Sequence, residues 1–212
     1  MAQEPRFPKP DPSFPFSTEI EDFAKAQATA PAIPNATLFL GSSSIRLWNV
    51  TESFPGLNAI NRGFGGATTP DVLHYYKRLR PPVAPRSIIV YVGENDLSGG
   101  ALPEKVARDI LTLLEWLRAD YPKARIACMS LKPSPIRWTS YPKMEAVNHA
   151  IAAHAQATGF AWIEVGHVLL APDGLPDASL FRADGLHLNS LGYARWNEIV
   201  SAWLKGNVNA TP

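Results

Sequence analysis

The strongest constraint on the fold is a regular alternation between short apolar runs and longer amphipathic stretches. From Thr37 onward, each apolar run is followed by a stretch whose apolar residues recur at helical spacing. Apolar strands between helices indicate strands that are covered on both faces, and right-handed crossovers make such a sheet parallel. We therefore expect an α/β fold with three α/β/α layers and a flavodoxin-like parallel sheet of five strands. The predicted strands are 37–41, 57–63, 87–93, 124–131 and 160–166, and the predicted helices after them are 70–79, 103–120, 142–159 and 189–206.

The first sixteen residues have a different character. Prolines at positions 5, 8, 10, 12 and 15 remove backbone donors and favour extended geometry. We interpret residues 1–16 as a proline-rich arm, which either docks through its phenylalanines, Phe7, Phe14 and Phe16, or remains a flexible leader. A helix is expected next, capped by Ser17 or Thr18. Residues 17–212 are predicted to form one domain, because a chain of 212 residues with 46% hydrophobic content can build a single core.

Charge, cysteine content and hydropathy exclude several classes of function. The formal net charge is +1, so no nucleic-acid partner is expected. The single cysteine, Cys128, lies in an apolar stretch and is predicted to be a buried core residue. No apolar run approaches the roughly 18 residues that cross a bilayer, and no signal peptide is evident. The default expectation is a soluble cytoplasmic protein, or an exported one if a signal peptide has been removed. The sequence does not predict an oligomeric state.

Polar residues that follow the predicted strands are the candidates for a functional site, because ligands of open parallel sheets bind beyond the carboxyl ends of the strands. These candidates are Ser42, Ser43 and Ser44, residues 63–68, Glu94, Asn95 and Asp96, and residues 132–138. No metal-binding motif, Walker sequence or complete dinucleotide fingerprint is present, so neither a metal nor another cofactor is expected.

A potential catalytic pair lies near the end of the chain. Asp184 precedes His187 by three residues in a glycine-containing turn, ahead of a helix expected to start at Asn189 or Ser190. A tight turn lets the carboxylate accept from Nδ1–H and leaves Nε2 free to act as a general base. Activity would then fall as the pH drops through the titration of His187.

A serine nucleophile also needs N–H donors where negative charge develops in the transition state. The glycine-rich stretch 61–68 offers the amide of Gly66, the stretch after the third strand offers the side-chain amide of Asn95, and Ser43 offers its own N–H. Taken alone, however, the triple serine favours a helix cap. It also suits a non-catalytic, flavodoxin-like module that holds a phosphate or another ligand against a helix N-terminus.

Four stretches together resemble the SGNH, or GDSL-type, serine hydrolase superfamily of esterases and lipases: "GSSSIRLW", "NRGFGGAT", "GEND" and "DGLH". The resemblance spans residues 38–204 and implies an SGNH-hydrolase-like catalytic domain. It further implies a catalytic triad of Ser43, Asp184 and His187, with an oxyanion hole formed by Ser43, Gly66 and Asn95. The family usually has aspartate where this chain has Ser42. Aligning the preceding glycine nevertheless selects Ser43 as the nucleophile.

The implied reaction is hydrolysis of a small-molecule carboxylic ester, with a short acyl chain, through an acyl-enzyme. Alternatives within the family are a carbohydrate acetylesterase and a lysophospholipase or thioesterase. Arg137 and Trp138, in the loop after the fourth strand, are candidates for substrate binding. Three other tryptophans at helical positions, Trp116, Trp196 and Trp203, are predicted to lie in the core.

Overall fold

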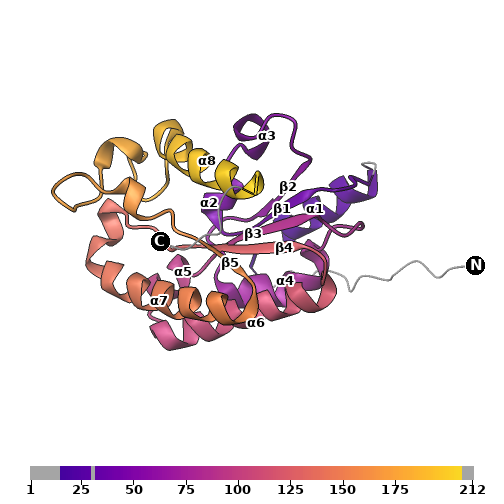
Figure 1. The fold of residues 1–212 in the computed structure, drawn as a ribbon, viewed down its shortest axis with the longest axis horizontal. Coiled ribbons are helices and arrows are strands. Elements are labelled where there is room, and N and C mark those ends of the chain that lie inside the picture. Colours follow the sequence, from indigo (N-terminus) through magenta and orange to yellow (C-terminus); the bar gives the residue numbers. More distant parts are fainter. Residues whose placement is uncertain (1–14, 30–31, 207–212) are drawn as a thin grey trace, which may run out of the picture.

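The computed structural model describes residues 15–29 and 32–206 and shows a parallel sheet between two helical layers (Figure 1). Its five strands run in the order β2-β1-β3-β4-β5 and all pair in parallel. This arrangement confirms the predicted fold class. The strands are β1 Thr37–Gly41, β2 Ala59–Gly63, β3 Ser87–Tyr91, β4 Arg125–Met129 and β5 Ala161–Ile163.

The helices divide between the two faces of the sheet. Helices α1, α4, α6 and α7 contribute to one core, whereas α2, α3 and α8 contribute to the other. Their bounds are α1 Ser17–Thr29, α2 Ser43–Arg46, α3 Val50–Ser53, α4 Thr69–Leu79, α5 Glu94–Ser98, α6 Pro103–Asp120, α7 Tyr141–Thr158 and α8 Ser190–Leu204. Three 3-10 helices lie in the connections: η1 Pro135–Ser140, η2 His167–Leu169 and η3 Ala178–Leu180.

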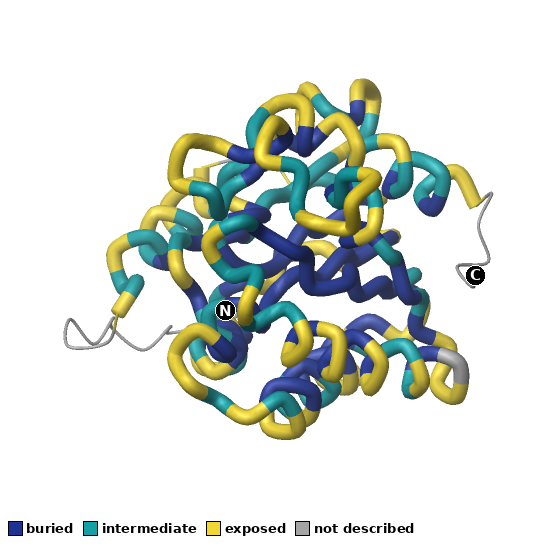
Figure 2. Tube along the Cα trace, turned by 90° about the vertical axis from the view of Figure 1, so that its left-hand side faces the viewer, coloured by how far each residue is buried: buried dark blue, intermediate teal, exposed yellow. Residues whose placement is uncertain are grey.

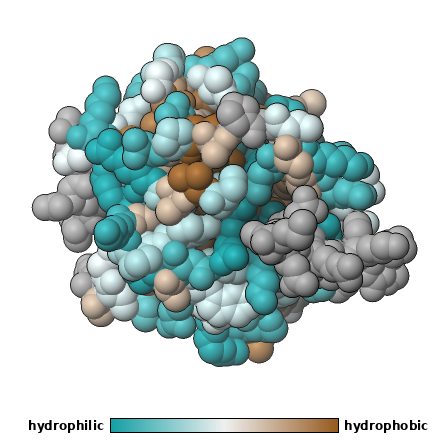
Figure 3. Space-filling view, turned by 90° about the vertical axis from the view of Figure 1, so that its right-hand side faces the viewer, coloured by the Kyte–Doolittle hydropathy of each residue, from teal (hydrophilic) through white to brown (hydrophobic). Residues whose placement is uncertain are grey.

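The central strands are apolar on both faces because both faces are covered. In β1, Leu38 and Leu40 pack into the core under α4 and α6, whereas Phe39 between them packs into the core under α8. The backbone trace shows the sheet as a buried layer between helices whose outer sides are exposed (Figure 2). Figure 3 shows the opposite side of the molecule from Figure 2, and its surface is mostly hydrophilic with a small apolar patch. Among the described residues, no helix has both the length and the apolar content needed to span a bilayer.

Several sequence predictions need correction in detail. The short helices α3 and α5 were not predicted, the helix expected after the triple serine is only the four-residue α2, and β5 has three residues rather than the seven expected. Helix α1 begins at Ser17 itself, so the predicted cap is wrong. Trp116 is 43% exposed rather than buried, because it lies off the apolar face of α6 and covers the ring of Tyr76 at the surface. Cys128, Trp196 and Trp203 are buried, as predicted.

Of the proline-rich arm, only residues 15 and 16 are described. Phe16 packs its ring edge-on against Phe64 at 5.2 Å, and the carbonyl of Pro15 accepts a hydrogen bond from the hydroxyl of Tyr75. Phe7 and Phe14 lie outside the described residues. The boundary at residue 16 stays a prediction.

Candidate active site

The three consecutive serines occupy different environments at the end of β1. Gly41 has φ +151°, and a Cβ there would collide with the carbonyl oxygen of Tyr91, so the chain needs glycine at this turn. Ser42 takes the cap position of α2, yet its side chain makes no capping hydrogen bond. Ser42 and Ser44 are 3% and 2% exposed, whereas Ser43 is only partly buried. The serine whose side chain is accessible is therefore Ser43.

Asp184 and His187 meet within one tight turn. One carboxylate oxygen, Oδ1, accepts from the amides of Leu186 and His187 at 2.9 Å each. The other, Oδ2, lies 2.7 Å from Nδ1 of His187. The hydrogen bond with the imidazole, helped by the two amides, holds the pKa of Asp184 well below its ordinary range. An ionised carboxylate at this place keeps the imidazole proton on Nδ1.

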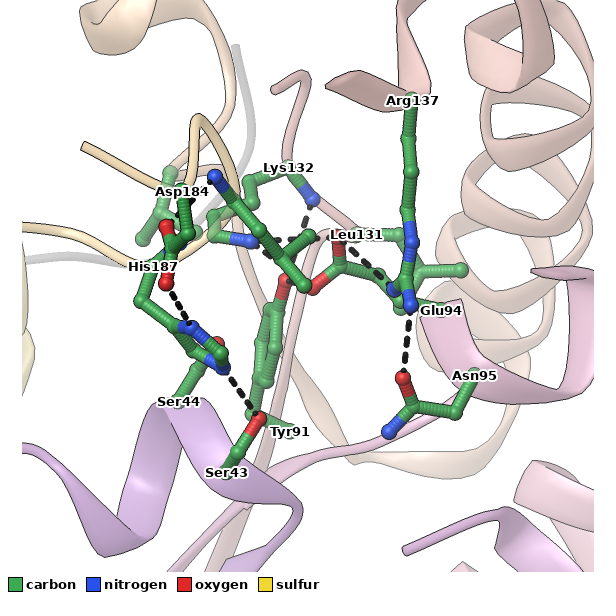
Figure 4. Close-up of polar contacts among 12 residues, drawn as sticks. Ser43, Ser44, Tyr91, Glu94, Asn95, Leu131, Lys132, Arg137, Asp184 and His187 are labelled. Atoms are coloured by element: carbon green, nitrogen blue, oxygen red, sulfur yellow. Dashed lines mark hydrogen bonds and ion pairs between the residues drawn. The ribbon is translucent and has the colours of Figure 1, made fainter. Parts of the chain in front are cut away.

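The opposite ring nitrogen of His187 faces the serine. Nε2 lies 2.9 Å from Oγ of Ser43, so Asp184, His187 and Ser43 form a continuous hydrogen-bonded chain (Figure 4). With Nδ1 protonated, Nε2 has a lone pair available for the hydroxyl proton. This is the geometry of a serine activated by a general base.

Helix α8 aligns the histidine turn with the serine. Asn189 caps the helix by accepting from the amides of Leu191 and Gly192, and the helix begins at Ser190 as predicted. The hydroxyl of Tyr193 donates to the carbonyl of Ser44 at 2.8 Å, and the indole N–H of Trp48 donates to Asn197 at 2.9 Å. These two bonds join α8 to the segment that contains the serine.

The glycine-rich loop after β2 packs against the same segment. The side chain of Asn61 donates to the carbonyl of Ile45 at 2.7 Å and accepts from the amide of Gly63 at 2.8 Å. A Cβ at Gly63 would collide with the backbone of Arg46, so the loop can approach α2 this closely only with glycine. Asn61 thus fixes the start of the loop relative to the serine helix.

Farther along the loop, the backbone is anchored by a hydrogen bond to Glu19, which in turn pairs with Arg46. Glu19 accepts from the amide of Gly65 at 3.3 Å and pairs with Arg46 at 3.1 Å. Gly66 follows with φ +75°, a left-handed conformation that favours glycine. The space beside its α-carbon opens toward the ring of Phe16.

Asn95 lies in the first turn of α5 and contacts the same loop. Its amide nitrogen Nδ2 donates to the carbonyl of Ala67 at 3.0 Å, and its oxygen Oδ1 accepts from Nη2 of Arg137 at 3.0 Å. Its neighbour Asp96 is buried and accepts from the amide of Thr69 with both carboxylate oxygens, at 3.0 Å each. Burial raises the pKa of Asp96. These bonds join α5 to the loop that contains Gly66.

Beneath Asn95 lies a buried ion pair that sequence reasoning missed. Lys132 is 0% exposed, and its ammonium group contacts both carboxylate oxygens of Glu94 at 3.1 and 2.9 Å. The hydroxyl of Tyr91 also donates to Glu94, because burial, with the carboxylate beside it, raises the pKa of this phenol. A signal was present in the sequence, since Glu94 and Lys132 follow neighbouring strands and carry opposite charges.

The two residues predicted to bind substrate lie in η1 and face different surroundings. Arg137 contacts Asn95 and lies 3.9 Å from Glu94. Trp138 stacks on Tyr141 at 5.1 Å and lines an open pocket of about 540 Å³ with Leu170. Within residues 15–29 and 32–206, no three His, Cys, Asp or Glu side chains lie together as a metal site would require.

Comparison with known proteins adds an independent line of observation. The GDSL-like lipase/acylhydrolase family matches residues 45–195, a segment that contains the glycine-rich loop, α5 and the histidine turn and begins just after Ser43. The alpha2 subunit of platelet-activating factor acetylhydrolase IB from Rattus norvegicus is 30% identical over 172 residues, which cover 74% of this chain and 71% of that protein. The alpha1 subunit from Bos taurus is 29% identical over 171 residues, with 74% and 69% covered.

A solved structure has the same fold. A GDSL-like lipase from Bacteroides thetaiotaomicron superposes with a TM-score of 0.76 at 18% identity, over 89% of this chain and 98% of the other. The agreement therefore extends to the helical layers as well as the sheet.

Proposed function

The chain belongs to the GDSL-like lipase/acylhydrolase family, and on that basis we propose that it is a serine esterase that hydrolyses short-chain carboxylic esters through an acyl-enzyme. The observation that carries the proposal is the hydrogen-bonded chain in which His187 contacts Ser43 at 2.9 Å and Asp184 at 2.7 Å. Such a contact needs two segments 144 residues apart to meet in one orientation. A capping serine and a surface histidine would have no reason to do so.

In the proposed mechanism, Nε2 of His187 takes the hydroxyl proton as Oγ of Ser43 attacks the ester carbonyl. The oxyanion is stabilised by the amides of Ser43 and Gly66 and by Nδ2 of Asn95. When the tetrahedral intermediate collapses, His187 returns the proton to the leaving alcohol. Water then attacks the acyl-enzyme with the same proton transfers and releases the acid. Asp184 stays ionised and stabilises the imidazolium at each step.

The preference for a short acyl group is supported by the relatives, whose names describe acetylhydrolases. We further propose that the pocket beside Trp138 receives the alcohol part of the substrate, because the stacked rings of Trp138 and Tyr141 offer an apolar surface next to the η1 turn. An aromatic surface also suits a sugar, so a carbohydrate acetylesterase is the second candidate.

A purely ligand-binding role receives less support. That role needs a helix N-terminus to hold an anion, and α2 has only four residues, too short to build a substantial dipole. A ligand-binding role also does not explain the hydrogen bond between His187 and Ser43.

The test is hydrolysis of p-nitrophenyl esters of increasing acyl length. We expect wild-type protein to hydrolyse the acetyl and propionyl esters fastest and Ser43→Ala to lose the activity. Ser44→Ala is the matched control, because its buried hydroxyl lies one residue away. Activity that survives Ser43→Ala, or that disappears equally in Ser44→Ala, would refute the assignment of the nucleophile.

A further inference from the structure

The side chain of Asn95 is the least constrained of the three proposed oxyanion donors, since the other two are backbone amides. A side-chain amide can rotate, and a half-turn exchanges its donor and its acceptor. In this structure both ends are held. Nδ2 gives one hydrogen to the carbonyl of Ala67 at 3.0 Å, and Oδ1 accepts from Nη2 of Arg137 at 3.0 Å. The second Nδ2 hydrogen is left for the oxyanion.

Arg137 and the carbonyl of Ala67 together select which way the amide faces. A guanidinium group only donates, so a rotated Asn95 would set its NH₂ group against another donor. The unrotated amide turns Nδ2 toward the side of the site where Ser43 lies (Figure 4). The bond from Arg137 therefore adds to the bond with Ala67 in disfavouring the orientation in which Asn95 would present an oxygen to a developing negative charge.

The position of Arg137 is itself fixed from two sides. Its amide donates to the carbonyl of Ser134 at 3.1 Å, and the amide of its neighbour Ile136 donates to the carbonyl of Gly185 at 3.1 Å. Gly185 lies in the turn that contains Asp184 and His187. The η1 turn therefore connects the oxyanion side of the site with the histidine side.

Glu94 is the other acceptor near the guanidinium of Arg137. It attracts the guanidinium only weakly, because its carboxylate is already paired with Lys132. Its carboxylate is 4% exposed and already accepts from both Lys132 and Tyr91. Arg137 stays 3.9 Å away from Glu94, outside hydrogen-bond distance, and gives its hydrogen bond to Asn95. Lys132 thus supplies the charge that Glu94 needs and leaves Arg137 available.

We propose that Arg137 is a positioning residue for the oxyanion hole, which fixes the side-chain amide of Asn95 and is kept available for this role by the buried Lys132–Glu94 pair. The inference rests on the proposed function and deepens it. Arg137 is not assigned a contact with the substrate. Its effect should pass through Asn95 and should appear in the rate of the chemical step rather than in binding.

The test uses the rate at which a fluorophosphonate inactivates the full-length protein. In the adduct, the phosphonyl oxygen takes the place of the oxyanion, so the rate reports on the oxyanion hole without knowledge of the natural substrate. The variants are Arg137→Ala, Arg137→Lys, Asn95→Ala and the double Arg137→Ala/Asn95→Ala. The matched control is Arg86→Ala, since Arg86 is exposed and directly precedes β3 at the opposite end of the strand from Asn95.

We expect Asn95→Ala to slow inactivation by about 10²- to 10³-fold, as loss of one oxyanion donor does elsewhere. Arg137→Ala should slow it by about 10- to 100-fold, the cost of a misplaced group. In the Asn95→Ala background, the Arg137 substitution should have no further effect. Arg137→Lys should recover part of the rate, because lysine keeps a charged donor. On an ester substrate, Arg137→Ala should lower kcat and leave KM within about twofold.

Different results identify different failures. Labelling that is absent from the wild type, or that persists in Ser43→Ala, refutes the proposed function and this inference with it. Labelling that depends on Ser43 but is unaffected by Arg137→Ala refutes the inference alone. Equal losses from Arg137→Ala with and without Asn95 also refute it, because the arginine would then act independently. The melting temperature of each variant is measured alongside, to show that the variant is folded. Lys132→Met frees Glu94 to attract Arg137, so this variant should be labelled more slowly although it remains folded.

Discussion

Removing one charge of the buried Glu94–Lys132 pair should destabilise the protein strongly. In Glu94→Gln, the ammonium group of Lys132 remains fully buried with a neutral amide as partner, and the ring of Tyr91 lies 6.0 Å away. A buried charge left without its partner costs about 3–5 kcal/mol of unfolding free energy. For a chain of this size, each kcal/mol lowers the melting temperature by about 2–4 °C, so the expected decrease is about 6–20 °C.

Removing the charge of Lys132 instead of that of Glu94 should cost less unfolding free energy. In Lys132→Met, Glu94 keeps the hydroxyl of Tyr91 and has the guanidinium of Arg137 only 3.9 Å away. The guanidinium of Arg137 can therefore move toward Glu94 and replace the lost ammonium group, and it then gives up its hydrogen bond to Asn95. We expect Lys132→Met to lower the unfolding free energy by about 2–3 kcal/mol, which is below the usual cost of a broken buried pair.

The double variant decides whether the two charges stabilise each other. Urea unfolding followed by circular dichroism gives the unfolding free energy of the wild type, both single variants and Glu94→Gln/Lys132→Met. Because the two residues share one interaction, the double variant should lose less than the sum of the single losses. Additive losses, or single variants that each lose less than about 1 kcal/mol, would refute the reasoning.

Four shorter predictions test other parts of the structure. Because the pKa of Asp184 is lowered, its carboxylate stays ionised above about pH 4, so Asp184→Asn, which removes that charge, should lower kcat/KM throughout the range from about pH 5 to 8; an unchanged kcat/KM would contradict the triad. Burial raises the pKa of Cys128 to about 12, so iodoacetamide should not modify the native protein at pH 8, although it should modify the urea-unfolded chain. Gly41→Ala should lose about 3 kcal/mol or more in urea unfolding, because its φ of +151° is strained for alanine and the methyl group would strike Tyr91; a loss under about 1 kcal/mol would mean that the turn adapts. Tyr91→Phe removes a donor from buried Glu94 and should lower the unfolding free energy by about 1–3 kcal/mol, so an unchanged urea midpoint would contradict that bond.

The sheet was predictable because its pattern is local. The central strands β1, β3 and β4 are short, mostly apolar runs between helices, because burial on both faces disfavours polar residues there, whereas the partly buried edge strand β2 contains Asn61 and Arg62. Trp116 shows where pattern reasoning fails, since hydropathy alone does not say on which side of the apolar face of α6 a large ring will lie. The one-turn helix α2 could be expected only from the serines at its start, because its four residues contain too little periodicity to detect.

The candidate site divides in the same way. Asp184 and His187 interact within three residues, so their spacing predicts their contact. Arg137 was suspected only of binding substrate, whereas its bond to Asn95 joins residues 42 positions apart and depends on how η1 folds. Lys132 was included only as the start of a candidate loop, and no sequence pattern shows that a lysine is completely buried.

The two hydrogen bonds that join α8 to the serine segment make the chain suitable for division into complementing fragments. Ser43 lies before, and His187 after, the exposed residues 172–174, a natural place for a cut. Neither fragment would contain both partners of the 2.9 Å contact, and Tyr193 and Asn197 would have to find Ser44 and Trp48 again before it could form. Ester cleavage would then be a direct signal that the two pieces had found each other, with colour appearing only on reassembly.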